Sequence, residues 1–211
     1  NMTVNLGLGG YGIYHFFFSL PAIDAVPITE RIAGFPEFSI FGAIQVGYNA
    51  WALPIGYYFM DEPISMLAHH IAVLCVGSIS CFGTYGFRYH APFFFGVIEI
   101  SSVPLSIMNF CKNNKDLVDG RFPKLFLRIR VIFVVTFLTV RVIMWTPLIK
   151  DVLFSSGLLA WTCETNACRI GVASFWLSSF FLTLLQFYWA VLIIKAVAQI
   201  SIKKTSKDKA E

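Results

Sequence analysis

The sequence predicts an all-α fold, a polytopic membrane helix bundle of about six transmembrane helices. Of the 211 residues, 57% are hydrophobic and only 13% are charged, about half the charged share of a typical soluble domain. The mean hydropathy is +0.70. Charged residues also avoid the long apolar runs, such as Phe38–Met60, Ile71–Phe87 and Gly171–Ile194. Alternating segments of about ten residues, as in a transmembrane β-barrel, are not found.

The N-terminal part contains one short apolar stretch, Ile13–Val26, which Pro21 and Asp24 interrupt. Since the chain begins with Asn1-Met2, we expect upstream residues or a leader to have been removed, and this stretch to be the end of a first span. The glycosylation sequon Asn1-Met2-Thr3 would then be cytoplasmic and carries little weight. Residues 1–35 are therefore predicted to form a partial or first helix and a lumenal loop.

Residues 36–200 are predicted to form the transmembrane domain. Its first convincing span is Phe38–Met60, followed by a turn at Asp61-Glu62-Pro63, where Pro63 suits the first position of the next helix. The later predicted spans are Ile64–Phe87, Phe93–Cys111, Val131–Ile149 and Ile170–Ile200. Before the last span, an apolar piece, Val152–Trp161, leads into a short loop with two cysteines.

Positive charge predicts the orientation of the bundle. Lys112–Arg130 forms a basic loop, and residues 201–211 form a basic tail, which marks both as cytoplasmic. Two predicted spans separate them, so both fall on the same side, as the topology requires. The acidic segment Asp24–Glu37 and the loop holding Cys163 and Cys168 then lie on the lumenal side.

A lumenal position would allow a disulfide between Cys163 and Cys168, with two free cysteines as the alternative. Cys75, Cys81 and Cys111 are interpreted as packing residues. No cysteine pair has zinc-site spacing with histidine, so we predict no metal site and no cofactor.

Polar residues inside the predicted spans are candidate functional residues, because ionisable groups within a bilayer are costly. These residues are Asn49, His69, His70, Glu99, Arg141 and Gln186. A rise of ~1.5 Å per residue places His69, His70 and Gln186 at one level in the cytoplasmic half. The same estimate places Glu99 and Arg141 close enough in depth to form a structural ion pair, which we favour over a catalytic role.

His69 and His70 point about 100° apart on a helix, so they cannot both bind one metal ion. One of them could face a cavity and act as a catalytic general base or nucleophile. The alternative is a pair of interhelical hydrogen bonds worth ~1 kcal/mol each.

Five short motifs occur in order along the chain. They are Gly47-Tyr48, the His-His box Leu67–Leu74, Glu99–Pro104, Arg141-Val142-Ile143 and Gln186–Trp189. In this order and spacing the chain resembles the TLC domain family (TRAM, Lag1 and CLN8 proteins) over about Pro36–Gln199. The resemblance implies a membrane bundle with a central, lipid-accessible cavity lined by the histidines.

The resemblance also implies two kinds of function. Some members make ceramide from an acyl-CoA and a sphingoid base, so membrane lipids are the expected ligands and acyl-CoA the substrate if the chain is catalytic. Other members tune lipid composition or assist secretory proteins without known catalysis. The alternative for this chain is therefore a non-catalytic accessory or structural subunit of a larger membrane complex, with other membrane subunits as partners.

Three departures point away from acyl transfer to an amine. Trp51-Ala52 stands where the family often has an acidic residue, and Val73 stands where ceramide synthases carry threonine. Residues 88–95 lack the pair of aspartates that ceramide synthases have. A histidine base without an orienting acid is a weaker catalyst.

The C-terminal residues suggest a location. Lys207 and Lys209 stand fifth and third from the end, which resembles the dilysine retrieval signal of endoplasmic-reticulum membrane proteins. Alternatively, these lysines form an ordinary basic cytoplasmic flank, and the protein lies in another organelle membrane. The net charge of +4 is accounted for by cytoplasmic flanks, so nucleic acid is not an expected partner.

Overall fold

The computed structural model describes residues 2–114 and 124–208, which contain helices and turns but no strand. Six rods make up the bundle. They are α1 (Met2–Tyr14) with a π-helical turn (His15–Ser19), α3 (Ser39–Phe59), α4 (Ile64–Phe82), a rod ending in α5 (Ser102–Asn113), the joined helices α7 (Leu125–Leu138) and α8 (Trp145–Thr162), and α9 (Asn166–Asp208). This confirms the predicted all-α bundle.

Within the described residues, four of these rods are long and apolar enough to cross a membrane, judged by length and composition. They are Ile64–Phe82, Pro92–Asn113, Leu125–Thr162 and Asn166–Gln199. The other two rods, α1 and α3, carry buried amides at Asn5, Gln45 and Asn49. Polar residues of this kind lower the hydropathy of a helix but give the bundle interior hydrogen-bonding groups.

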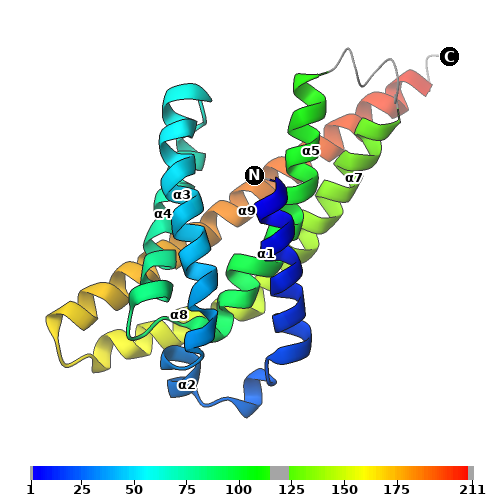
Figure 1. Ribbon diagram of the computed structural model, residues 1–211. Helices are drawn as coiled ribbons and strands as arrows, with labels where there is room; N and C mark the ends of the chain where they lie inside the picture. Colours follow the sequence, from blue (N-terminus) through cyan, green and yellow to red (C-terminus); the bar gives the residue numbers. More distant parts are fainter. Residues whose placement is uncertain (1, 115–123, 209–211) are drawn as a thin grey trace.

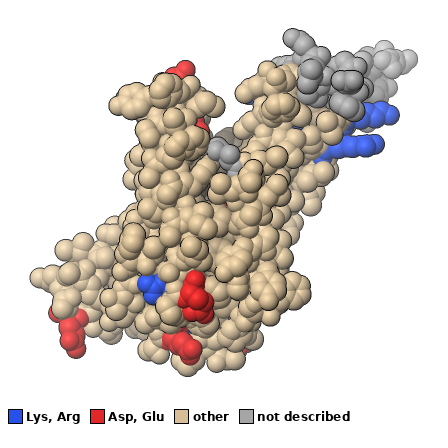
Figure 2. Space-filling model, viewed as in Figure 1, with Lys and Arg blue, Asp and Glu red and all other residues tan. Residues whose placement is uncertain are grey.

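Two groups of helices diverge at one end of the molecule (Figure 1). One group is the α3–α4 hairpin, and the other contains α1, α5 and α7, while α9 packs against α4 and α8. The end of α5, the start of α7 and the end of α9 lie at this same end, as predicted for the basic loop and tail. On the face drawn in Figure 2, Lys and Arg side chains lie beside the tips of α5 and α7, and several acidic side chains lie at the opposite end.

The first helix begins earlier than predicted. Helix was predicted within Ile13–Val26, whereas α1 spans Met2–Tyr14 and its π-helical extension ends at Ser19. Glycine weakens isolated helices, but here it allows close packing. A Cβ atom added to Gly12 would lie 2.5 Å from the Cα atom of Gly96, so the two backbones are in direct contact.

The segment between α1 and α3 folds across the end opposite the basic loop. It contains two short 3₁₀ turns, Ile23–Ala25 and Pro36–Phe38, and the short helix α2 (Ile28–Ala33). Figure 1 shows α2 below the lower end of α3, close to α8. This segment therefore covers one end of the bundle.

Two predicted boundaries are wrong. The predicted span Val131–Ile149 and the apolar piece Val152–Trp161 belong to one continuous rod, Leu125–Thr162. The helix continues through the charged position Asp151 because Arg31 forms an ion pair with it. Conversely, α4 ends at Phe82 rather than Phe87, since Gly83 has an extended backbone.

The rod before α5 is irregular over its first two turns. It begins with a π-helical turn, Pro92–Gly96, and a 3₁₀ turn, Val97–Ser101. A third π-helical turn in the described residues, Thr139–Met144, joins α7 to α8. Such turns change which face a side chain occupies and often occur at functional sites. Here they hold Glu99 near Arg141.

Several sequence predictions concern residues that the structure does not describe. Asn1 of the glycosylation sequon lies outside the described residues. The same holds for Lys115, Asp116, Asp119 and Arg121 of the basic loop and for Lys209 of the tail. Lys112, Lys124, Arg128 and Arg130 of the loop are described.

Candidate functional site

A cavity of about 580 Å³ lies inside the bundle. This volume is within the range of small-molecule binding sites. Its lining extends along α9 from Phe175 to Ile193, which corresponds to ~27 Å of helix. Because one leaflet of hydrocarbon is only ~15 Å deep, the cavity is long enough for an acyl chain. Figure 2 shows a hollow between the two diverging groups of helices.

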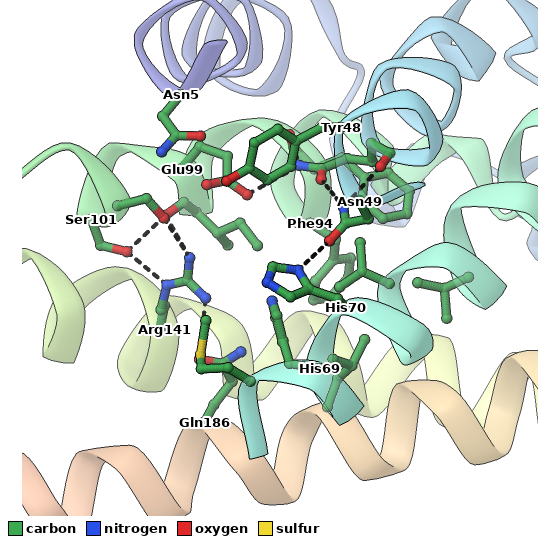
Figure 3. Close-up of a pocket in the computed structure, with 18 of the residues that line it drawn as sticks. Asn5, Tyr48, Asn49, His69, His70, Phe94, Glu99, Ser101, Arg141 and Gln186 are labelled. Carbon is green, nitrogen blue, oxygen red and sulfur yellow. Dashed lines mark hydrogen bonds between the residues drawn. The ribbon is translucent and has the colours of Figure 1, made fainter. Parts of the chain in front are cut away.

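The six polar residues predicted from the sequence all line this cavity. They are Asn49, His69, His70, Glu99, Arg141 and Gln186. His69, His70 and Gln186 were predicted to lie at the same depth in the bundle. The structure agrees, because the centroid of the His69 ring lies 5.4 Å from that of Trp189, which follows Gln186 by three residues on α9. Figure 3 shows the six side chains meeting in one region of the cavity.

His70 begins a chain of hydrogen bonds with a fixed direction (Figure 3). Its Nδ1 atom lies 2.7 Å from Asn49 Oδ1, and Asn49 Nδ2 donates to Gln45 Oε1 at 2.9 Å. Gln45 Nε2 in turn donates to Glu99 Oε1 at 3.0 Å. Because Asn49 Oδ1 can only accept, His70 must carry its proton on Nδ1. The Nε2 atom of a neutral His70 is therefore the one free to accept a proton.

A carboxylate absent from the sequence-based site lies beside that atom. Glu62 Oε2 is 3.3 Å from His70 Nε2, although the angles do not form a hydrogen bond. Asp61 has a φ angle of 47°, which turns the chain back so that the Glu62 amide donates to the Gly56 carbonyl. Glu62 was predicted only as a turn residue, and nothing in the sequence indicated that this turn directs it into the cavity.

Arg141 projects from the π-helical turn Thr139–Met144 and is 7% exposed. It donates to Ser101 Oγ at 2.7 Å and to Ser102 Oγ at 3.0 Å. Longer contacts of 3.4 Å join it to the Gln186 side-chain oxygen and to the Ile98 carbonyl. Neither serine was predicted as a site residue, although both belong to the Glu99–Pro104 motif.

The predicted ion pair between Glu99 and Arg141 is absent from the described residues. Glu99 accepts its hydrogen bond from Gln45, and Arg141 is held by Ser101 and Ser102. The depth estimate was correct, since both residues line the cavity. The error concerned the direction of the Glu99 side chain, which the 3₁₀ turn at Val97–Ser101 sets and which depth along a helix does not predict.

Four buried polar atoms that line the cavity make no hydrogen bond within the described part of the chain. They are Glu62 Oε2, His69 Nδ1, Ser80 Oγ and Gln186 Nε2. The Gln186 side chain is 0% exposed, so bulk water does not reach it. Buried polar groups normally have partners, and a group without one indicates a site for a ligand or an ordered water.

A second polar cluster lies at the other end of the cavity. Asp151 accepts hydrogen bonds from Arg31 at 2.7 Å and contacts His90 Nε2 at 2.9 Å. His90 lies in a short turn outside the candidate spans and is 4% exposed. Burial lowers the pKa of His90, although the hydrogen bond to Asp151 opposes this change. The cluster links α2 to α8 and was not predicted.

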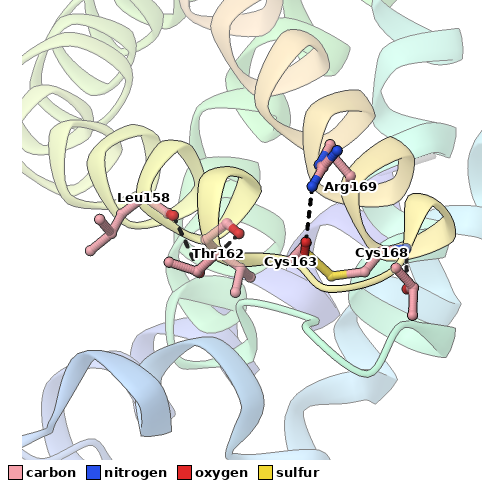
Figure 4. The surroundings of a disulfide bond; sticks show 7 residues. Leu158, Thr162, Cys163, Cys168 and Arg169 are labelled. Atoms are coloured by element: carbon pink, nitrogen blue, oxygen red, sulfur yellow. Dashed lines mark hydrogen bonds between the residues drawn. A yellow bond between two sulfur atoms is a disulfide. The ribbon is translucent and has the colours of Figure 1, made fainter.

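The structure joins Cys163 to Cys168 by a disulfide in the turn between α8 and α9 (Figure 4). Arg169 donates to the Cys163 carbonyl at 3.2 Å and supports the same turn. Cys75, Cys81 and Cys111 are free. Over the described residues, no group of three or more His, Cys, Asp or Glu side chains could hold a metal ion.

Comparison with known proteins gives one family. The family model described as the TLC domain matches residues 7–195. The match begins earlier than the resemblance noted from the motifs and includes most of α1. No curated protein and no solved structure matched the chain significantly.

Proposed function

Because the chain belongs to the TLC domain family, we propose that this integral membrane protein binds a lipid with a long acyl chain in its cavity. The acyl chain occupies the apolar part of the cavity. The polar head group lies against the band of polar residues around His70 and Arg141. Membrane lipids are thus the proposed partners of this chain.

The observation that carries this proposal is the distribution of polarity in the cavity. Side chains such as Val76, Phe94 and Phe175 line the apolar part, while hydrogen-bonding groups gather around Asn49 and Arg141. Ligand pockets of this kind are mostly apolar with a few polar groups that fix orientation. An amphipathic lipid matches both parts.

Purification in mild detergent followed by mass spectrometry of bound lipid tests the proposal. Leu182 lines the cavity and is 6% exposed, whereas Leu184 on the same helix is 53% exposed and does not line it. We expect Leu182→Trp to fill the cavity and reduce bound lipid at least tenfold. Leu184→Trp is the matched control and should retain lipid. Wild-type protein that is folded but carries no lipid would overturn the proposal.

A second candidate function is acyl transfer from an acyl-CoA to an amine or hydroxyl group of a lipid. It is favoured by the hydrogen bonds that fix the protonation state of His70 and by the nearby Glu62. Asn49 orients the ring through Nδ1, as the third group of a catalytic triad does, and Glu62 would stabilise the positive charge that His70 gains on accepting a proton. The nucleophile would attack the thioester carbonyl and its proton would pass to His70 Nε2. The carbon–sulfur bond would then break, and His70 would give that proton to the leaving sulfur to release the CoA thiol.

Turnover by purified protein tests the catalytic version. We expect His70→Ala to abolish product formation from acyl-CoA and a sphingoid base while lipid still co-purifies. His70→Gln serves as a polar variant without a base, and His69→Ala tests the other histidine. Product formation that is unchanged in all three variants would exclude a histidine-catalysed transfer.

An accessory role in a larger membrane complex is distinguished by size. A native particle much larger than the 23.7 kDa chain, with stoichiometric protein partners, would support that role over catalysis.

We further propose residence in the endoplasmic reticulum. Replacing Lys207 and Lys209 with serine should then release a tagged protein from that compartment in fluorescence microscopy.

A further inference from the structure

We propose that Arg141, Gln186 and His69 form a binding site for the carboxylate of a fatty acid. The inference rests on the proposed lipid-binding function and assigns the chemical group that the polar part of the cavity recognises. The three residues come from three different rods. Arg141 lies in the π-helical turn that joins α7 to α8, Gln186 lies in α9, and His69 lies in α4. Figure 3 shows their side chains directed toward one another.

Arg141 provides the positive charge. A buried guanidinium without a carboxylate contact is costly, and buried charges normally have a partner of opposite sign. The described partners of Arg141 are serine hydroxyls, a carboxamide and a carbonyl, all of them neutral. Two of the four bonds are 3.4 Å long, so donors remain for an anionic ligand.

Gln186 provides a donor that its surroundings fix in place. Its Oε1 atom accepts from Arg141, so its amide nitrogen must point away from that guanidinium. That nitrogen is buried and has no partner among the described residues. Exchanging the two amide atoms would place a donor against a donor, and therefore would not satisfy the group.

His69 provides the third group. Its Nδ1 atom is buried without a hydrogen bond in the described residues, and its ring packs edge-on against Trp189 at 5.4 Å. A ring nitrogen protonated on this side would donate to the same anion as Arg141 and Gln186.

The local charges favour a monoanion with a flat head group. Glu62 and Glu99 line the same cavity, so a dianion such as a phosphate monoester would be repelled more strongly than a monoanion. A planar carboxylate can accept from a guanidinium and a carboxamide at once. Free fatty acid carries this group at the end of an acyl chain.

Competitive binding measurements with three ligands of equal chain length test the site. They are hexadecanoate, hexadecanol and methyl hexadecanoate, each measured with purified protein in mild detergent by native mass spectrometry. We expect wild-type protein to bind hexadecanoate at least tenfold more tightly than hexadecanol or the methyl ester. Hexadecyl phosphate, as a fourth ligand, distinguishes a carboxylate site from a phosphate site.

Gln186→Glu is the decisive variant, because it keeps the shape of the side chain and places a negative charge beside Arg141. We expect it to reduce the preference for hexadecanoate to less than twofold and to leave hexadecanol binding unchanged. The control is Gln199→Glu, the same change at an exposed position of α9 that does not line the cavity. It should keep the preference.

Three results would overturn the site. They are equal binding of acid and alcohol by wild-type protein, equal loss of preference in both variants, and tighter binding of hexadecyl phosphate than of hexadecanoate. Arg141→Gln gives an independent check where the protein folds, with the same loss of preference expected. Failure of all ligands to bind would instead refute the lipid-binding function, so the two failures are distinguishable.

Discussion

Asn49 Oδ1 lies 2.7 Å from His70 Nδ1, and the carboxamide of Asn49 has only one orientation that satisfies its neighbours. Its nitrogen donates both to the Gln45 side chain and to the Gln45 carbonyl. The amide is 2% exposed, so water does not replace these contacts. One buried asparagine therefore sets the proton position of the histidine from the adjacent helix.

Replacing Asn49 with leucine should destabilise the protein. The change leaves His70 Nδ1 and Gln45 Oε1 buried without their partner, which we expect to cost about 1–3 kcal/mol of unfolding free energy. Denaturant unfolding in mixed micelles measures the loss. Asn109→Leu, at an exposed position of α5, is the control and should change the stability by less than about 0.5 kcal/mol.

Contact between α1 and the rod that begins at Pro92 should depend on the absence of a side chain at Gly12. A Cβ atom there would lie 2.5 Å from Gly96 Cα and 2.6 Å from the Pro92 carbonyl oxygen. We expect Gly12→Ala to destabilise the bundle by about 1–3 kcal/mol, because the helices must separate.

Gly10→Ala is the matched control on the same helix, since nothing lies within 4 Å of an added Cβ atom. Alanine is a better helix former, so this variant should be as stable as wild type or more stable by up to ~1 kcal/mol. Thermal unfolding of both proteins in one detergent measures the difference. Equal melting temperatures for the two variants would contradict the contact.

The stability of the protein should fall when the pH drops below about 6.5, the ordinary pKa of histidine. Burial lowers the pKa of His90, so the unfolded chain binds a proton before the folded chain does. The stabilisation is complete above the unfolded-state pKa and decreases on acidification, by at most ~1.4 kcal/mol per pH unit for one proton.

Unfolding measured between pH 7.5 and 5.5 tests this dependence against His90→Gln. The variant lacks the ionisable ring. The slope of its unfolding free energy against pH should therefore be smaller, by at most ~1.4 kcal/mol per pH unit, which corresponds to one proton. The described histidines and acids that do not contact His90 are the same in both proteins and therefore cancel in the comparison. Asp151 does not cancel, because it loses its contact with His90, and Arg31 remains its partner in both proteins. Identical slopes would show that His90 does not contribute.

Thiol labelling should find two classes of cysteine. In denatured, unreduced protein we expect labelling of Cys75, Cys81 and Cys111, with Cys163 and Cys168 labelled only after reduction. Because the closed loop is short, breaking the disulfide should cost about 2 kcal/mol by the chain-entropy estimate. Mass spectrometry of the labelled peptides gives the assignment, and labelling of all five without reduction would refute it.

The helices that were easiest to predict are those with continuous apolar sequence. α3 and α9 begin and end within a few residues of their predicted limits at the ends that the structure describes, except that α9 extends to Asp208. The continuation of α8 beyond Ile149 was not predicted, because the charged residues Lys150 and Asp151 follow that position. Arg31, the partner of Asp151, lies 120 residues away in sequence, and such a contact leaves no local signal.

For the candidate site, the residues that line the cavity could be predicted, whereas their hydrogen-bond partners could not. Polar residues inside apolar helices identified the cavity lining, because their cost in a bilayer is visible in the sequence itself. The pairing of these residues depended on side-chain direction. Ser101 replaced Glu99 as the partner of Arg141, since a 3₁₀ turn and a π-helical turn change which face each residue occupies.

The rod formed by α7 and α8 has a mechanical consequence for a protein in a bilayer. Its 38 residues correspond to ~57 Å of helix, nearly twice the ~30 Å hydrocarbon thickness. Such a rod must tilt strongly or extend beyond the bilayer, and Figure 1 shows it inclined to α3 and α4. Since both groups of helices border the cavity, a thinner or thicker membrane would change their relative tilt and with it the width of the hollow between them.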